Sequence, residues 1–144
     1  MAADEGAINL SQGFPDFAVD KAIIDLVHQY MNEGHNQYAP MPGIAPLRNV
    51  IAEVVEKTYA RKINPDSEIT VTTGATEGLF ASIIGLVHPG DEVIVFDPCY
   101  DSYNPAIRLS GGIPIHINLK YPEFSIDWSE VEEKVSSRTK LIMN

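Results

Sequence analysis

Hydrophobic and polar positions change their arrangement along the chain near residue 67. Before that point, loops rich in Gly and Pro alternate with two helical patterns, at about residues 19–32 and 44–62. After it, short runs rich in β-branched residues alternate with helical stretches. The short runs predict strands at Glu68–Thr73, Glu92–Phe96, Ile113–Leu119 and Lys140–Met143, and the stretches between them predict helices at about residues 75–87, 100–109 and 127–135.

This alternation predicts an α/β fold, because crossovers of a dozen or more residues are what parallel strands in one sheet require. We expect a mostly parallel sheet flanked by helices and preceded by an N-terminal loop and helices. Asp127, with Glu130 three residues later, predicts a capping box at the start of the last helix. The pattern divides the chain into residues 1–66 and 67–144. The second part stops on a strand without the loop that usually carries ligand groups, so we expect a truncated domain.

Composition narrows the class of protein and its partners. Ten basic residues against twenty acidic ones give a net charge of −10, which disfavours a nucleic-acid or anionic-membrane partner. The single cysteine, Cys99, forms no internal disulfide, so we expect a reducing, cytoplasmic location. The longest apolar region, around residues 79–87, is far shorter than the roughly 20 residues of a membrane span. The four histidines lack metal-ligand spacing, and we expect no metal site.

The most informative segment is residues 70–78, a predicted strand that passes through a turn of small residues into a helix. Small residues let main-chain N–H groups approach a ligand, and a helix N-terminus favours an anion. The turn therefore indicates either a phosphate site or a tight strand-to-helix connection that needs a glycine for its geometry. It is neither a Walker loop nor a dinucleotide fingerprint. The candidate phosphate-binding residues are Gly74, Ala75 and Thr76.

A second candidate segment, residues 96–103, follows the next strand, where side chains project into the same crevice of an α/β sheet. Tyr100 is placed to stack on a planar ligand, although Tyr100 and Tyr103 are equally suited to covering the end of the sheet. We expect Cys99 to be an inert core residue. Two long loops, at residues 11–17 and 36–43, are typical either of binding loops or of surface connections.

Four motifs together resemble the class I/II aminotransferases of the pyridoxal-phosphate (PLP) fold-type-I group. The resemblance covers nearly the whole chain, with the motifs in the family's order, and it is strongest to methionine-preferring and kynurenine/glutamine aminotransferases. The motifs are Ile8-Asn9-Leu10-Ser11-Gln12-Gly13-Phe14-Pro15-Asp16-Phe17, Asn36-Gln37-Tyr38 with Gly43 and Leu47-Arg48, Thr73-Gly74-Ala75-Thr76-Glu77, and Asp97-Pro98-Cys99-Tyr100-Asp101-Ser102-Tyr103.

The resemblance implies a role for each motif. The main-chain amides at Gly74–Thr76 would hold the phosphate of PLP, and Tyr100 would stack on its pyridine ring. Tyr38 would reach the cofactor phosphate of the neighbouring subunit, which implies a homodimer. Gly13 and Phe14 would lie over the substrate.

The resemblance also implies what the 144 residues lack. In the family, the Schiff-base lysine and the other catalytic side chains belong to segments after the strand that matches Lys140–Asn144, so no catalytic residue is predicted here. We expect the whole protein to move an amino group between an amino acid (methionine, aromatic or glutamine-like) and a 2-oxo acid, and this piece alone to be inactive. Two alternatives stay open: a non-catalytic module that binds a phosphate ligand or a partner, and one half of a split enzyme.

Overall fold

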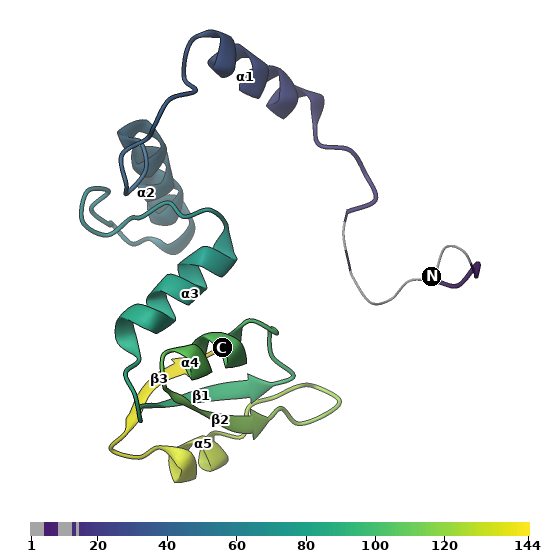
Figure 1. The fold of residues 1–144 in the computed structure, drawn as a ribbon, viewed down its shortest axis with the longest axis vertical. Coiled ribbons are helices and arrows are strands. Elements are labelled where there is room, and N and C mark those ends of the chain that lie inside the picture. Colours follow the sequence, from purple (N-terminus) through teal and green to yellow (C-terminus); the bar gives the residue numbers. More distant parts are fainter. Residues whose placement is uncertain (1–4, 9–12, 14) are drawn as a thin grey trace. The chain divides into compact units, whose positions relative to one another are not determined.

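The computed structural model describes residues 5–8, 13 and 15–144, which fall into two compact units, Met1–Pro40 and Met41–Asn144. Along the described chain, the second unit contains every strand and all helices except the first (Figure 1). None of the helices in these ranges combines the length and apolar character that a membrane crossing requires. The division into residues 1–66 and 67–144 stays a prediction about function.

The first unit contains one helix, α1 (Lys21–Asn32), which is built by local signals. The Asp20 carboxylate caps it by accepting a hydrogen bond from the Ala22 amide at 2.8 Å. Lys21 pairs with Asp25 one turn later, with Nζ 2.7 Å from Oδ1. No side chain of α1 is buried within this part of the structure. The helix is therefore specified by its cap and its charge pattern and not by a core of its own unit.

The first helix of the second unit is α2 (Ala45–Tyr59), which has a proline in its first turn. Ala60, the residue that follows it, lies in the left-handed region (φ 53°). The predicted helix ran to residue 62. Its inward stripe has helical spacing and consists of Arg48, Ile51, Ala52 and Val55. Of these, Arg48 alone is fully buried, so the stripe begins with a charge.

The predicted strand Glu68–Thr73 is wrong in this structure, since these residues form no strand. A β-strand needs a neighbouring strand to satisfy its amides and carbonyls. In the described part of the chain, no strand pairs with this segment, and its Val71 amide donates instead to the Pro42 carbonyl at 3.0 Å. The segment is a connection without regular secondary structure that leads into α3.

The remaining pattern confirms the α/β prediction. Three strands form a parallel sheet of order β2-β1-β3, with Glu92 opposite Ile113 and Asp97 opposite Asn118. The three helices of this part, one before the first strand and two between strands, are shorter than predicted by one to three residues at an end. The elements are α3 (Ala75–Leu86), β1 (Glu92–Asp97), α4 (Tyr103–Leu109), β2 (Ile113–Asn118), α5 (Trp128–Lys134) and β3 (Thr139–Met143).

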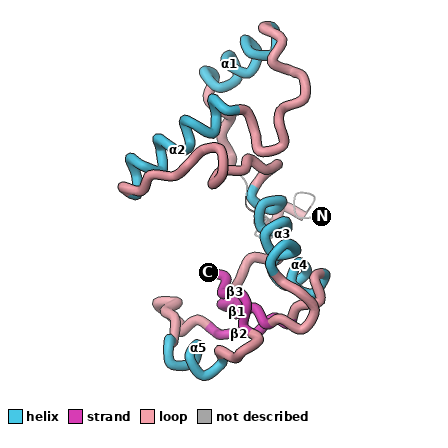
Figure 2. The backbone as a smooth tube through the Cα atoms, turned by 90° about the vertical axis from the view of Figure 1, so that its left-hand side faces the viewer, coloured by secondary structure: helices cyan, strands magenta, loops and turns pink. Residues whose placement is uncertain are grey.

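Helices cover both faces of the sheet (Figures 1 and 2), which is why the central strand β1 is apolar at consecutive positions. Val93 and Val95 pack with residues of α3 and α4, including Ile83 and Ile107. Ile94 and Phe96 pack on the other face, with Ile117 of β2 and Val131 of α5 in the same cluster. This two-sided core fixes where the ends of β1 lie.

Polar side chains hold the amino end of β1 and the start of α5. The buried Glu92 carboxylate, at the amino end of β1, accepts a hydrogen bond from Ser136 Oγ at 2.6 Å and pairs with Arg138. These contacts lower the pKa of Glu92, and the hydrogen bond from Ser136 has the largest effect. The Asp127 side chain caps α5 as predicted, accepting from the Glu130 amide at 3.3 Å. The carboxylate of Glu130 turns to Lys134 and Lys120 instead of returning to Asp127, so only half of the predicted capping box forms.

Candidate functional site

The turn that leads into α3 is built around Gly74. Gly74 adopts φ +86°, a backbone conformation that a residue with a side chain rarely adopts. Two short contacts hold it: its amide donates to the Thr72 carbonyl at 2.8 Å, and Thr72 Oγ1 donates to the Gly74 carbonyl at 3.0 Å. The geometry explains why glycine stands at this position, as the simpler of the two interpretations of the motif requires.

The amides after Gly74 are arranged as donors for an anion. The first backbone bond into the helix runs from the Gly78 amide to the Gly74 carbonyl, so the amides of residues 75–77 precede the helical ladder. Among the residues that the structure describes, no side chain forms a capping hydrogen bond at this end of α3. The Glu77 carboxylate accepts a hydrogen bond from the amide of Thr73, the residue before Gly74. It therefore does not occupy the amides of the first helical turn. These donors, together with the positive end of the helix dipole, favour a ligand of negative charge.

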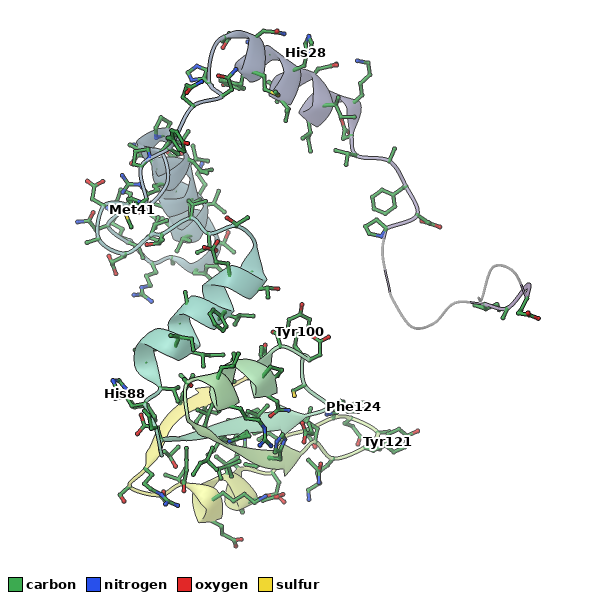
Figure 3. All side chains as sticks on the ribbon, in the orientation of Figure 1. His28, Met41, His88, Tyr100, Tyr121 and Phe124 are labelled. Carbon is green, nitrogen blue, oxygen red and sulfur yellow. The ribbon has the colours of Figure 1, made fainter. Side chains whose placement is uncertain are left out.

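Tyr100 lies beside this turn, although it is far from it in sequence. Tyr100 is labelled in Figure 3. Its hydroxyl is 3.4 Å from Thr76 Oγ1. About half of the Tyr100 side chain is exposed, and its ring meets Tyr103 edge to face at 5.9 Å. The sequence placed Tyr100 inside a helix, but α4 begins at Tyr103, which leaves Tyr100 on the loop after β1. That loop brings an aromatic ring and a set of N–H donors to one place.

The carboxyl ends of the three strands surround a small hollow of about 160 Å³. Tyr100 and Tyr103 line one side of it, and Met143 and Asn144 at the end of β3 line another. Such a position, outside the carboxyl ends of parallel strands, is where α/β sheets bind ligands. Tyr100 thus lies at the crevice expected from the strand order and meets Thr76 of the predicted phosphate turn, although Gly74, Ala75 and Thr76 do not themselves line this hollow.

The Asp97 side chain organises the start of the loop that carries Tyr100. Asp97 Oδ2 lies 2.7 Å from His116 Nδ1, across the β1–β2 pair. Burial, followed by the hydrogen bond and charge of Asp97, raises the pKa of the neighbouring Cys99 thiol. A raised pKa leaves less of the thiolate that attacks electrophiles, and Cys99 packs against the core cluster of α3 and α4. Both observations agree with the prediction that Cys99 is not a nucleophile.

Two predicted contributors lie in the other unit. Gly13 and Tyr38 are both exposed there, and Phe14 lies outside the described residues. Their roles toward substrate and cofactor therefore stay predictions. Among the described residues, no group of three or more His, Cys, Asp or Glu side chains is arranged to hold a metal ion.

Sequence reasoning missed two polar contacts that organise the site. The first is the Asp97–His116 pair, which depends on the pairing of β1 with β2. The second is the burial of Arg48, which forms hydrogen bonds with two loops. A signal for Arg48 was present, because it stands at the head of the inward stripe continued by Ile51 and Val55.

Comparisons with known proteins identify the class. The family model for "Aminotransferase class I and II" matches residues 5–143. The chain belongs to this family.

Individual relatives place it more closely within the family. A methionine aminotransferase of Escherichia coli strain K12 is 50% identical over 143 residues, covering 99% of the chain and 37% of the relative. Kynurenine–oxoglutarate transaminase 3 of Mus musculus is 39% identical over 154 residues, covering 99% of the chain and 34% of the relative. The chain thus spans about a third of the length of these relatives.

Solved structures give the same result for the fold. An Escherichia coli crystal structure described as a methionine aminotransferase superposes with a TM-score of 0.95 at 50% identity, covering 98% of the chain and 37% of that structure. The N-succinyldiaminopimelate aminotransferase of Mycobacterium tuberculosis superposes at 0.91 with 36% identity, covering 98% and 37%. These similarities confirm the predicted family and the predicted fold class.

Proposed function

We propose that residues 67–144 supply the cofactor-phosphate part of a PLP-dependent aminotransferase, and that residues 1–66 supply its substrate-covering and dimer-contact loops. The observation that carries the proposal is the meeting of Thr76 and Tyr100 at 3.4 Å beside the uncapped start of α3. Family membership makes PLP the ligand with a matching phosphate and a matching planar ring.

The chemistry of the donors present fits PLP. Backbone N–H groups of Ala75 and Thr76, with the Thr76 hydroxyl, are suited to a phosphate dianion, and their preorganisation at a helix N-terminus needs no bound metal. The Tyr100 ring is suited to a pyridine face. Bound PLP supplies the electron sink through which an amino group can leave an amino acid and join a 2-oxo acid. The residues of this chain bind and orient that group at its phosphate end and its ring face.

Among the described residues, no lysine lines the hollow at the carboxyl ends of the strands. Lys120 and Lys134 pair with Glu130 on the α5 side of the sheet, and Lys134 also donates to the His116 carbonyl at 2.7 Å. Lys57 and Lys62 form ion pairs with Glu53 and Glu56 on α2. We infer that the attaching lysine comes from a segment beyond residue 144, and that the 144 residues alone do not transaminate.

The substrate of the whole protein is proposed from its relatives. Relatives of this chain are named for methionine, kynurenine, N-succinyldiaminopimelate and aspartate, so the class is an amino acid paired with a 2-oxo acid. The 50% identity to a methionine aminotransferase favours methionine as the first donor to assay, followed by aromatic and glutamine-like donors. Gly13 and Phe14 would cover the substrate, and Tyr38 would reach the phosphate of a second subunit in a homodimer. A cytoplasmic location stays a prediction from the sequence.

The test is made on the full-length protein encoded by the parent gene, with the 144-residue chain as the control. We expect the full-length protein to be yellow with bound PLP, to be dimeric, and to transfer the amino group of methionine to a 2-oxo acid. The control should bind no PLP covalently and transfer nothing. A natural product of only 144 residues without a PLP band would support a non-catalytic phosphate-binding module. Activity that appears only with a copurifying second chain would support a split enzyme.

A further inference from the structure

The second unit contains a buried arginine that the proposed function does not use. Arg48, on the first turn of α2, is 8% exposed. Its Nε donates to the Gly43 carbonyl at 3.1 Å, and one terminal nitrogen donates to the Pro65 carbonyl and to Asp66 Oδ1 at 2.9 Å. The guanidinium thus joins the loop before α2 to the loop that follows it.

Stability alone is a weak reason for this arrangement. Removing a guanidinium from water is unfavourable, and well-packed apolar side chains at such positions are often as stable or more stable. The carboxylate partner, Asp66, has a mostly exposed side chain. Its ion pair with Arg48 is therefore weak and offsets little of the free energy lost by removing the guanidinium from water. The planar guanidinium, however, fixes the direction of each hydrogen bond, which an apolar side chain or a lysine does not reproduce. Its contribution is therefore to the geometry of the loops it joins.

The geometry continues from Gly43 to the segment that leads into the phosphate turn. A Cβ atom on Gly43 would lie 2.6 Å from Val71 Cγ2, so the two residues are in tight contact. The Val71 amide also donates to the Pro42 carbonyl at 3.0 Å. These contacts align the residues that follow, up to Gly74.

The last step reaches the turn itself. Thr72, next to Val71, donates through Oγ1 to the Gly74 carbonyl at 3.0 Å. It also contacts the first turn of α3, since a Cβ on Gly78 would lie 3.2 Å from the same Oγ1. A continuous series of close contacts therefore runs from Arg48 through Gly43 and residues 71–72 to the start of α3.

We propose that Arg48 is a positioning residue for the cofactor phosphate. It holds the Gly43 carbonyl, and through it the segment at residues 71–74, so that the amides at the start of α3 point toward one place. Arg48 itself does not touch the phosphate in this account. The inference rests on the proposed function, because it assigns the held turn to the phosphate of PLP.

The test measures PLP binding by the full-length protein apart from its activity. Arg48→Lys keeps the charge but loses the rigid, planar set of guanidinium N–H donors. We expect it to raise the PLP dissociation constant about tenfold. The ³¹P resonance of the bound phosphate should shift toward that of free PLP. The matched control is Arg138→Lys, which alters another arginine–carboxylate contact at the amino end of β1, opposite the candidate site. It should lower the thermal midpoint of the apoprotein and leave PLP affinity unchanged.

A purely structural role for Arg48 would give a different result. Arg48→Lys would then behave like Arg138→Lys, with a lower apoprotein midpoint and an unchanged dissociation constant, and the inference would be overturned. If Arg48→Lys does not fold, Val71→Ala decides the question, because it loosens the contact with Gly43 without altering the guanidinium. It should also weaken PLP binding, and unchanged affinity would refute the proposal. If the wild-type full-length protein binds no PLP, the proposed function itself has failed.

Discussion

The stacking role of Tyr100 gives the most direct quantitative prediction for a single residue. Tyr100→Ala in the full-length protein removes the ring beside the uncapped start of α3. Stacking of a planar heterocycle on an aromatic side chain contributes about 1–3 kcal/mol. That loss corresponds to a PLP dissociation constant roughly five- to 150-fold higher.

A milder substitution separates the ring from its hydroxyl. Tyr100→Phe keeps the ring and removes only the contact with Thr76 Oγ1, whose 3.4 Å distance is long for a hydrogen bond between hydroxyls. Such a contact contributes at most about 1 kcal/mol. We therefore expect less than a roughly fivefold change in affinity for Tyr100→Phe. The part of the prediction that depends on the structure is that Tyr100→Ala weakens PLP binding more than Tyr100→Phe does.

The assay is a fluorescence titration of the apoprotein with PLP, with thermal midpoints measured on the same samples. Tyr121→Ala is the matched control, because Tyr121 is a highly exposed aromatic on the loop between β2 and α5 (Figure 3). It should leave the dissociation constant unchanged. If Tyr100→Ala binds PLP as tightly as the wild type, Tyr100 only covers the end of the sheet, which was the alternative interpretation from sequence.

Three further predictions concern the scaffold of the full-length protein. Gly112→Ala places a Cβ 2.6 Å from Val87 Cγ1 and should destabilise the fold by about 1–3 kcal/mol, whereas Gly85→Ala meets open space; thermal midpoints that match would contradict this. Asp127→Ala removes the cap of α5 and should cost about 1 kcal/mol by denaturant unfolding, with Asp127→Asn close to wild type. The lowered pKa of Glu92 stabilises the fold above the usual carboxyl pKa, and this contribution is lost as pH falls through the lowered value. Glu92→Gln should therefore weaken the dependence of the thermal midpoint on acid pH; an unaltered dependence would assign it to other carboxylates.

Most of the second unit was predictable because its signals are local and agree with each other. The run Val93–Phe96 is apolar and rich in β-branched residues, and the structure buries it from both sides in the central strand. The start of α5 followed from Asp127, which caps it. The position of Tyr100 after the carboxyl end of β1 also followed from the sequence. Its meeting with Thr76 was expected from two strand ends, but the strand predicted before Thr76 does not form, so that half of the reasoning was wrong.

The misses were features that depend on partners far away in sequence. Residues 68–73 have the composition of a strand, but strand formation depends on a neighbour that the local sequence does not specify. The Asp97–His116 pair depends on the register of β1 against β2, in which Val95 lies opposite His116. Burial of Arg48 depends on two loops closing over it. To predict any of these three features, one must know the order of the strands or the packing of the loops, and the local residue pattern does not determine either.

The central claim is that the start of α3 holds the phosphate of PLP. A crystal structure of the full-length protein with PLP tests it most directly. We predict phosphate oxygens within about 3.2 Å of the amide nitrogens of Ala75 and Thr76, with the pyridine ring against Tyr100. A structure that places the phosphate on other residues, with the amides of this turn bonded only to water or protein, would contradict the account.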